Sequence, residues 1–388
     1  MAAAQTGFGA FLSVYLTEQK WDQTAIGFAL SIGTVAGIVT RLPGGALVDA
    51  VHAKRAPIAA ALILLAASAL LLAAWPSVLP VWLALILHAF SGSVLTPAIA
   101  AVTLSICGQN AFGERLGSNA RYASLGNAAA AGLLGLAAML SHRAVFLLTA
   151  AMVVPALIAL HWIEPHQVDA EQDHPALLHP KVRKQRHGYP WQIFVRRHLH
   201  VFAVCVVLFH LSNAAMLPLA LNEMAARGGG AGWVISASVI VPQALVALLS
   251  PWTGRMAQSW GRRPLLLIGF AAVPLRALLF APLPSAPWLV LFELLDGVSA
   301  TVFGIMLPLI AADLTRRTGY LNLAIGSLGL AASLGATLST IMAGWIADHV
   351  SPQAAFLALA AAGAASVLLI WIDMPETRPS RRPVAIHA

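Results

Sequence analysis

Long apolar segments separated by short polar ones run along nearly the whole chain. An α-helix needs roughly 17 to 25 mostly apolar residues to cross a hydrocarbon layer of ~30 Å. The segments are rich in Ala, Gly and Leu and lack the apolar/polar alternation of membrane β-strands. The pattern therefore predicts an all-α integral membrane protein with twelve transmembrane helices, over Ala2–Leu16, Thr24–Val48, Ala56–Ala74, Val81–Ile106, Ser118–Leu140, Ala144–Ile163, Leu199–Asn222, Gly232–Thr253, Leu265–Ala281, Pro287–Ala312, Tyr320–Ala347 and Ala354–Ile372.

The first of these segments is shorter than the others. About fifteen residues at 1.5 Å each span only ~23 Å, which is less than the hydrocarbon layer. The segment also lacks the basic start and the cleavage site of a signal peptide. We therefore expect Met1 to fall within the first helix and the native start to lie upstream.

Composition and charge narrow the class of protein. The chain is 59% hydrophobic and 10% charged, whereas about a quarter of the residues of a soluble protein are charged. The net charge of +8 does not indicate a nucleic-acid partner, because the basic residues lie in short loops between apolar segments. Most Lys and Arg residues follow even-numbered helices, and the opposite loops hold only Lys20, Arg143 and Arg227. This asymmetry predicts cytoplasmic termini and a location in the plasma membrane, the inner membrane of a bacterium.

The longest polar stretch divides the chain into two halves. Residues 164–198 contain four prolines and clustered basic residues, which is typical of a linker. We expect a six-helix bundle over 1–163, a cytoplasmic basic linker over 164–198, a second bundle over 199–373 and a cytoplasmic tail over 374–388. The linker histidines raise a metal site as the less favoured alternative, because their spacing is irregular and no cysteine accompanies them. No cofactor and no metal are expected.

An internal repeat supports the division into halves. Residues 119–132 and 322–335 share Asn, Ser-Leu-Gly and several small residues at an offset of 203, so that Asn119 matches Asn322. His88 and Glu293 match at an offset of 205. The repeat predicts two pseudo-symmetric bundles.

A short charged hairpin occurs in both halves and carries a family resemblance. The first copy contains Gly45, Leu47, Asp49, Lys54 and Arg55; the second contains Gly254, Gly261, Arg262 and Arg263, with Gln258 in place of the acid. The first copy resembles the Major Facilitator Superfamily signature Gly-x-Leu-Ala-Asp-Arg-x-Gly-Arg-Lys, although it departs from it at Ala50, His52 and Ala53. The resemblance implies that Asp49 binds the start of a neighbouring helix and latches one conformation, on one side only. A plain basic turn is the alternative.

Ionisable residues inside the apolar segments are the candidates for chemistry. Glu293 and Asp296 lie three apart on one helix, and Arg276 lies at a matching depth on the helix before it. We expect an Arg276–Glu293 ion pair that leaves Asp296 as the proton or cation site, with His88 as a further coupling candidate. A static network of paired charges is the alternative.

Other polar residues are candidates for the substrate pathway. His210 and Asn213 share one helix face before Pro218, and the resemblance places their helix opposite His88 and Asp296. Arg121 and Asn127 lie on the fifth helix. Helix-to-helix contacts are the alternative role for each of them.

These features favour gradient-driven, proton-coupled secondary transport of a small solute rather than an enzyme, because the sequence contains no phosphate-binding Gly-Lys-Ser/Thr loop and no nucleophile–base constellation. The expected partners are a small-molecule substrate, protons or another coupling ion, and the lipid bilayer, and we expect a monomer. Export of an amphipathic compound by rocking of the halves is the first expectation. Import of a metabolite or metal chelate is the second, and a transporter-like membrane sensor or membrane enzyme is the alternative of another class.

Overall fold

The computed structural model describes residues 9–51, 53–163, 197–226, 232–316 and 318–378. The part so described is helical throughout and contains no strand. Ten of its helical segments are long and apolar enough to cross a membrane. The helices are α2 (Gly9–Glu18), α3 (Gln23–Ala50), α4 (Arg55–Ala74), α5 (Val78–Leu140), α6 (His142–Ala151), α7 (Val153–His161), α10 (Arg197–Asn213), α11 (Met216–Ala226), α12 (Gly232–Ser259), α13 (Arg262–Phe280), α14 (Ala286–Thr315), α15 (Leu321–His349) and α16 (Pro352–Asp373).

Helix α5 corrects one expected loop. The fourth and fifth apolar segments were expected to be joined by a polar loop over 107–117, but this stretch is helical apart from a single break at Gly108, where φ is 65° and ψ is 175°. Glycine adopts a positive φ without the strain that a Cβ would cause. Phe112 and Leu116, which follow the break, are buried. Their burial explains why a stretch with several polar residues is helical.

Two expected helices are each divided by a proline. The sixth segment forms α6 and α7, which meet at Met152, and the seventh forms α10 and α11, which meet at Ala214 and Ala215. Pro155 and Pro218 lie just beyond these breaks. A proline has no N–H to donate to the carbonyl four residues before it, and its ring crowds that carbonyl. At the second break, the amide of Ala215 instead donates to the hydroxyl of Ser339 at 3.1 Å.

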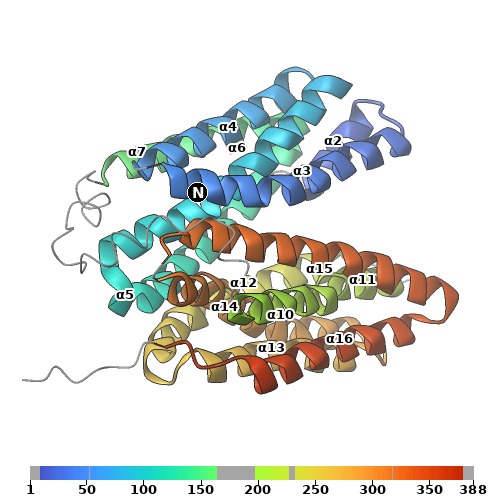
Figure 1. The fold of residues 1–388 in the computed structure, drawn as a ribbon. Helices are drawn as coiled ribbons and strands as arrows, with labels where there is room; N and C mark the ends of the chain where they lie inside the picture. The colour runs from blue at the N-terminus through green and yellow to red at the C-terminus, as the bar shows by residue number, and fades with distance from the viewer. Residues whose placement is uncertain (1–8, 52, 164–196, 227–231, 317, 379–388) are drawn as a thin grey trace, which may run out of the picture.

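Each half of the chain has a hydrophobic core of its own. One cluster of buried side chains draws its members from α2, α3, α4, α6, α7 and the first part of α5. A second cluster lies among α10 to α16 and takes in Phe112 and Leu116 from the second part of α5. Figure 1 shows these halves as two groups of helices, one above the other, with α5 reaching down to the lower group. The expected linker, 164–198, lies almost entirely outside the described residues.

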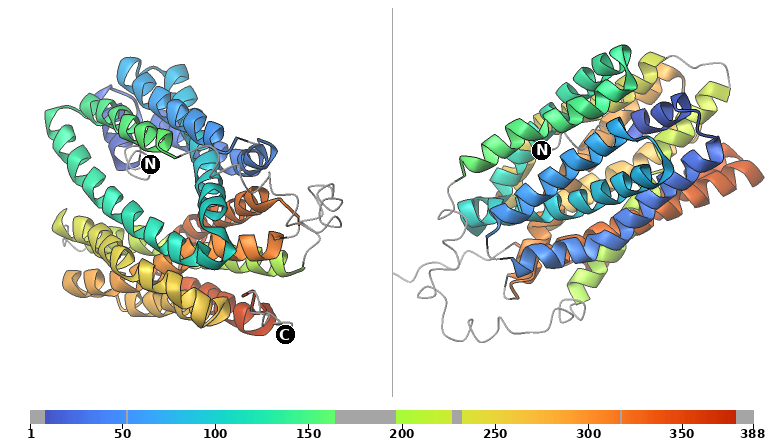
Figure 2. Two further views of the ribbon diagram at one scale, coloured as in Figure 1. Left: turned by 90° about the vertical axis from the view of Figure 1, so that its left-hand side faces the viewer. Right: turned by 90° about the horizontal axis from the view of Figure 1, so that it is seen from above.

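The halves approach each other closely at two helix crossings, and Figure 2 shows the long helices of both groups running side by side. In the first crossing, a Cβ added to Gly45 of α3 would strike the carbonyl oxygen of Asn322 of α15. In the second, a Cβ added to Gly254 of α12 would strike the carbonyl oxygen of Gly113 of α5. Both crossings are therefore backbone against backbone, which only glycine allows.

The two crossings correct the register expected for the repeat. Gly45 and Gly254 are related by an offset of 209 residues, and so are Gly113 and Asn322. The offset of 203 that matches Asn119 with Asn322 therefore does not relate equivalent positions at the crossings. Asn119 donates to the hydroxyl of Thr103 at 3.0 Å within α5, whereas Asn322 contacts the other half. Matches among Ala- and Gly-rich helices gave a misleading register.

Along α3, close packing is confined to the end that carries Asp49. A Cβ on Gly44 or Gly45 would meet atoms closer than 3.0 Å, whereas a Cβ on Gly37 or Gly27 would meet nothing within 4 Å. On α5, Gly113 is likewise tightly packed, whereas Gly132 and Gly135, farther along the helix, are open. We call the closely packed end the Asp49 end. The helices of the two halves touch there and leave more room beyond it.

Candidate functional site

A buried cluster of charges joins α13 and α14. Arg276 of α13 is 2% exposed; its Nη1 donates to Glu293 Oε2 at 3.0 Å and forms an ion pair with Asp296 Oδ1 at 2.6 Å. Glu293 and Asp296 both lie on α14, one turn apart on the same face. The two carboxylates therefore share a single guanidinium.

A third helix completes the cluster. Arg276 Nη2 donates to Asn213 Oδ1 at 2.6 Å, where Asn213 is the last residue of α10. Its Nε lies 3.4 Å from the sulfur of Met216, and its guanidinium carbon lies 5.8 Å from the centre of the Phe280 ring. These contacts fix the guanidinium on all sides, because Arg276 meets a partner on each of its nitrogens.

Asp296 does not lie apart from the ion pair, as the sequence led us to expect. The Arg276–Glu293 pair is present, but Asp296 binds the same nitrogen at the shorter distance. The two acids differ in access: the side chain of Glu293 is 1% exposed and that of Asp296 is 25% exposed. Asp296 joins the ion pair for a geometric reason: residues three apart on a helix present both side chains to one partner. Asp296 is thus the reachable acid of the cluster.

His88 is not part of this cluster. It is partly buried in the first part of α5, in the other half, and the contacts of Arg276 come from α10, α11, α13 and α14. The helices α5 and α14 begin at Val78 and Ala286, an offset of 208, which aligns His88 with Asp296 rather than with Glu293. Arg121 is exposed on the second part of α5, and Asn127, two turns farther on, is partly buried.

His210 and Asn213 lie on one helix face but have different neighbours. Asn213 binds Arg276, whereas His210 Nδ1 lies 3.1 Å from the carbonyl oxygen of Val206. The His210 ring meets Phe209 and Phe303 edge to face, with centroids 5.2 Å and 4.8 Å away. Phe209 and Phe303 stack on each other with centroids 4.9 Å apart. His210 thus belongs to an aromatic cluster next to the charge cluster.

Asp49, the penultimate residue of α3, binds the first turn of α15. Its Oδ1 accepts the backbone N–H of Asn322 at 3.1 Å and the Asn322 side-chain amide at 2.7 Å, and its Oδ2 accepts the N–H of Leu323 at 2.7 Å. Tyr320, the residue before α15, provides no side-chain cap. Asp49 therefore supplies, from the other half, the carboxylate that favours a helix N-terminus.

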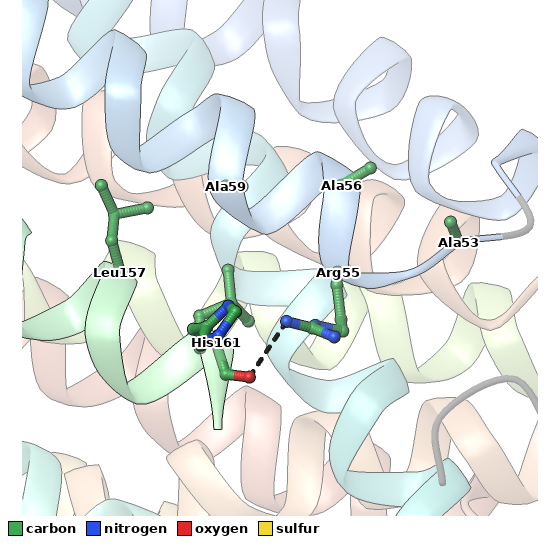
Figure 3. A pocket seen from close by; sticks show the side chains of 7 residues that line it. Ala53, Arg55, Ala56, Ala59, Leu157 and His161 are labelled. Carbon is green, nitrogen blue, oxygen red and sulfur yellow. Dashed lines mark hydrogen bonds between the residues drawn. The ribbon is translucent and has the colours of Figure 1, made fainter. Parts of the chain in front are cut away.

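The basic residues after Asp49 stabilise the C-terminal ends of two helices, α3 and α7. Lys54 Nζ donates to the carbonyl oxygens of Val48 and Val51, both at 2.7 Å, at the end of α3. Arg55 Nη2 donates to the carbonyl oxygen of His161, the last residue of α7, at 3.3 Å. Figure 3 shows this hydrogen bond between two residues that line a small pocket, most of whose other lining residues are Ala and Leu. Cations at helix C-termini are favourable for the same reason as Asp49 at an N-terminus.

The second copy of the hairpin holds its charges within one half. Arg262 Nε donates to Asp313 Oδ2 of α14 at 3.0 Å, and both side chains are almost fully buried. The backbone N–H groups of Arg262 and Arg263 donate to Glu376 Oε1 and Oε2 at 2.9 Å and 3.1 Å. A Cβ added to Gly261 would strike the same carboxylate. The start of α13 is therefore capped by an acid from the segment after α16.

At the second crossing itself, no carboxylate is among the contacts of the described residues. Gly254 packs on Gly113, and the carboxamide of Gln258 lies beside Gly113. Ser124 of α5 donates to the backbone oxygen of Gln243 of α12 at 2.9 Å and also contacts its side-chain oxygen. The acid that joins the halves is present only in the first copy.

Several polar residues of these networks were missed in the sequence. Asp313 and Glu376 lie at or just beyond the ends of apolar segments, where acids are common and carry no signal. Arg41 lies inside the second apolar segment, so the rule that flags ionisable residues within the membrane identifies it. The part of the chain that the structure describes contains no group of three or more His, Cys, Asp or Glu side chains suited to a metal ion, and four of the linker histidines lie outside it.

Comparison with known proteins agrees with this architecture. The family model described as Major Facilitator Superfamily matches residues 1–224 and again residues 201–387. A protein of Mycobacterium tuberculosis (strain ATCC 25618 / H37Rv), named as an uncharacterized MFS-type transporter, is 36% identical over 385 residues, which cover 97% of this chain and 91% of that protein. The class B tetracycline resistance protein of Escherichia coli is 32% identical over 135 residues, 34% of this chain and 33% of that protein.

A solved structure is similar in fold. The proton:xylose symporter XylE bound to 6-bromo-6-deoxy-D-glucose aligns with a TM-score of 0.76 at 14% identity, over 97% of this chain and 94% of that one. One family model matches once in each half, and the M. tuberculosis relative is similar over nearly the whole chain. This multi-pass membrane protein therefore belongs to the Major Facilitator Superfamily, whose members are transporters of small molecules and not enzymes.

Proposed function

We propose that this protein is a proton-coupled secondary transporter that exports an amphipathic small solute across the plasma membrane by alternating access. The observation that carries the proposal is the sharing of Arg276 by two acids, Glu293 and Asp296, in a buried site. Charged groups inside a membrane are costly, so a buried cluster of them is a functional candidate.

The charge count of the cluster gives the coupling mechanism. Ionised Glu293 and Asp296 carry two negative charges against the single positive charge of Arg276. One proton makes the cluster neutral, and Asp296 is the acid that solvent reaches. In our proposal a proton on Asp296 releases its bond to Arg276, while Glu293 and Asn213 keep the guanidinium in place. His88, which aligns with Asp296 in the other half, is the further coupling candidate.

The membrane arrangement follows from the same helices. We propose twelve spans in two six-helix bundles. Helix α5 counts as two spans that meet at Gly108, and α2 is part of the first span of the chain. The bundles are 1–163 and 199–373, joined by the linker 164–198 and followed by the tail 374–388. The Asp49 end carries most of the loop Lys and Arg, so we assign it, with both termini, to the cytoplasm. A monomer contains both halves and every residue of the cluster.

Alternating access requires that the contact at the Asp49 end be made and broken. The hydrogen bonds from Asp49 to α15 latch the state that is closed to the cytoplasm. Lys54 and Arg55 support this first side of the latch. On the second, weaker side Gly254 packs on Gly113 of the other half, while Gly261, Arg262 and Arg263 hold the start of α13 within their own half. In this closed state His210, Asn213, Arg121 and Asn127 line or border the solute pathway.

Relatives support export over import. The class B tetracycline resistance protein is similar over a third of this chain, and a multidrug resistance protein B homolog of M. tuberculosis is 26% identical over 218 residues. Drug resistance by transport requires outward movement of the drug. The proton gradient drives such export when each solute is exchanged for entering protons.

The test uses purified protein in liposomes with an imposed pH gradient. Tetracycline and ethidium serve as probes, and proton release is followed with a pH-sensitive dye. We expect at least one probe to move against its gradient with proton counterflow, and Asp296→Asn to abolish the counterflow. Asp348→Asn, which changes an exposed acid at the far end of α15, is the matched control and should be fully active. Full gradient-driven transport by Asp296→Asn would disprove the coupling role.

A further inference from the structure

Arg41 is an arginine well inside helix α3. It lies eight residues before Asp49, about 12 Å along the helix axis from the latch. Its side chain is partly buried rather than extended into solvent. A charge at this depth is costly, so Arg41 calls for an explanation.

Arg41 lies on the interface between the halves. Its backbone oxygen packs on Gly326 of α15, one turn beyond the contact of Gly45 with Asn322. Its side chain runs on along α15, where an added Cβ on Gly329 would lie 3.2 Å from Arg41 Cδ and 3.5 Å from Nη1. Gly37, one turn before Arg41 on α3, has open space around it. The guanidinium therefore lies where close packing ends and the space between the halves begins.

Arg41 differs from the other buried arginines in its partners. Arg276 binds two acids and Arg262 binds Asp313. Among the described residues, Arg41 forms no ion pair and its guanidinium makes no hydrogen bond. Of the acids near it in sequence, Asp49 is fully engaged with α15. A guanidinium presents a planar array of donors that fits a carboxylate or a phosphate, and here that array is unused.

The position has no cationic counterpart in the other half. At the offset of 209 that relates the two crossings, Arg41 corresponds to Ser250, whose backbone oxygen packs on Gly117 in the same way. The Ser250 hydroxyl is bonded to Val246 O within its own helix at 2.6 Å. The crossing therefore does not need an arginine for packing.

The surroundings of Arg41 suit a solute that has an aromatic or apolar part and a charged group. His210 of α10 packs on the same helix as Arg41, since its Cβ would lie 3.0 Å from a Cβ on Gly335 of α15. Gly329 and Gly335 are about 9 Å apart along α15 and about 120° apart around its axis, so Arg41 and His210 contact α15 on different faces, less than two turns from each other. Beyond His210 lie the stacked rings of Phe209 and Phe303.

We propose that Arg41 binds the anionic group of the transported solute, and that the apolar part of the solute lies toward His210 and Phe303. The substrate class is thus an amphipathic organic anion that carries a carboxylate, sulfonate or phosphate. This inference rests on the proposed transport function and adds the chemistry of its substrate. Aromatic faces and a desolvated guanidinium together give affinity and charge selection.

The test measures thermal unfolding of the purified full-length chain in detergent. The probes share one ring system: 1-naphthoate, 1-naphthalenesulfonate and 1-naphthyl phosphate, with 1-naphthylmethylammonium as the cationic match. A ligand that binds the folded state raises its unfolding temperature by mass action. We expect at least one anion, and not the cation, to raise it, and Arg41→Gln to lower the apparent affinity at least tenfold. Arg41→Lys is expected to keep part of it.

The controls separate binding from folding. Arg115→Gln removes an exposed cation outside the proposed pathway and is expected to bind the anion as the wild type does. Without ligand, Arg41→Gln is expected to unfold at the same temperature as the wild type or higher, because it removes an unpaired charge. The proposal is overturned if no anion stabilises the wild type, if the cation does so equally, or if Arg41→Gln keeps the anion response. None of these results depends on proton flux, so they are distinct from failure of coupled transport.

Discussion

Asp49 of α3 caps α15 across the interface of the two halves: its carboxylate accepts the backbone N–H of Leu323 at 2.7 Å and that of Asn322 at 3.1 Å. The residue that would ordinarily provide this cap, Tyr320, cannot do so with its phenol. The carboxylate cap on the first turn of α15 is consequently in place only while the halves are together at this end.

Asp49→Asn is expected to weaken the closed state by about 1–2 kcal/mol, since hydrogen bonds to a charged group are worth about 1.5–3 kcal/mol and the amide keeps part of them. About 1.4 kcal/mol corresponds to a tenfold change in population. Spin labels at cysteines replacing Arg115 and Ser259, with Cys107 and Cys205 changed to serine, report the distance between the halves. We expect a second, longer distance and reduced transport, whereas Gln258→Ala is expected to change both far less. A distance distribution identical to that of the wild type would contradict the role of Asp49.

Gly45→Ala is expected to separate α3 from α15. The added Cβ would strike the backbone oxygen of Asn322, which cannot turn aside as a side chain can. The matched change is Gly37→Ala on the same helix, where a Cβ would meet nothing within 4 Å. The spin-label distance should lengthen in the first variant and stay unchanged in the second. Equal behaviour of the two variants would show that the crossing is not the closing contact.

Arg276→Gln is expected to lower the free energy of unfolding by about 3–5 kcal/mol, because it leaves a buried carboxylate without its partner. Unfolding temperature in detergent is the measurement. Adding Glu293→Gln should restore most of the loss, since the unpaired charge is then removed. Arg121→Gln, an exposed arginine, serves as the control. If the double variant were less stable than Arg276→Gln, an unpaired Glu293 carboxylate would not be the cause of the lost stability.

Glu376→Gln is expected to destabilise the second half without shifting the equilibrium between open and closed states. Glu376 caps α13 through Arg262 and Arg263, which belong to the same half. The loss of a charged cap is worth about 1 kcal/mol. Glu114→Gln changes an exposed acid and provides the comparison. Unfolding should begin at a lower temperature while the distance between the halves is kept; a longer distance would instead make Glu376 part of the latch.

Helix positions could be predicted from the sequence because apolar segments of membrane length leave little choice of structure. Most predicted bounds lie within a few residues of the observed ones. The prediction of a loop around Phe112 failed for a physical reason. The polar residues of this stretch are typical of a loop, but its helix is stabilised by packing on α12 of the other half. That contact joins residues far apart in the chain, which hydropathy cannot detect.

The charge cluster could be predicted in part. The matching depth of Arg276 and Glu293 in adjacent predicted helices indicated their ion pair. Depth alone does not say how many acids one guanidinium binds. Asn213 and Met216 come from another helix, and their approach depends on the break before Pro218. For Asp49, the resemblance indicated a helix N-terminus without saying which, since the choice of α15 follows from the pairing of helices in space.

The glycine crossings between the halves have a consequence for the speed of switching. Where Gly45 meets Asn322 and Gly254 meets Gly113, the surfaces that part are main-chain atoms with no side-chain rotamers to rearrange. The activation barrier for parting therefore comes from the hydrogen bonds of Asp49 and Ser124 and from the withdrawal of Phe112 and Leu116 from the second cluster. Single substitutions at these positions are expected to change the rate of interconversion more than substitutions of core residues whose contacts all lie within one half.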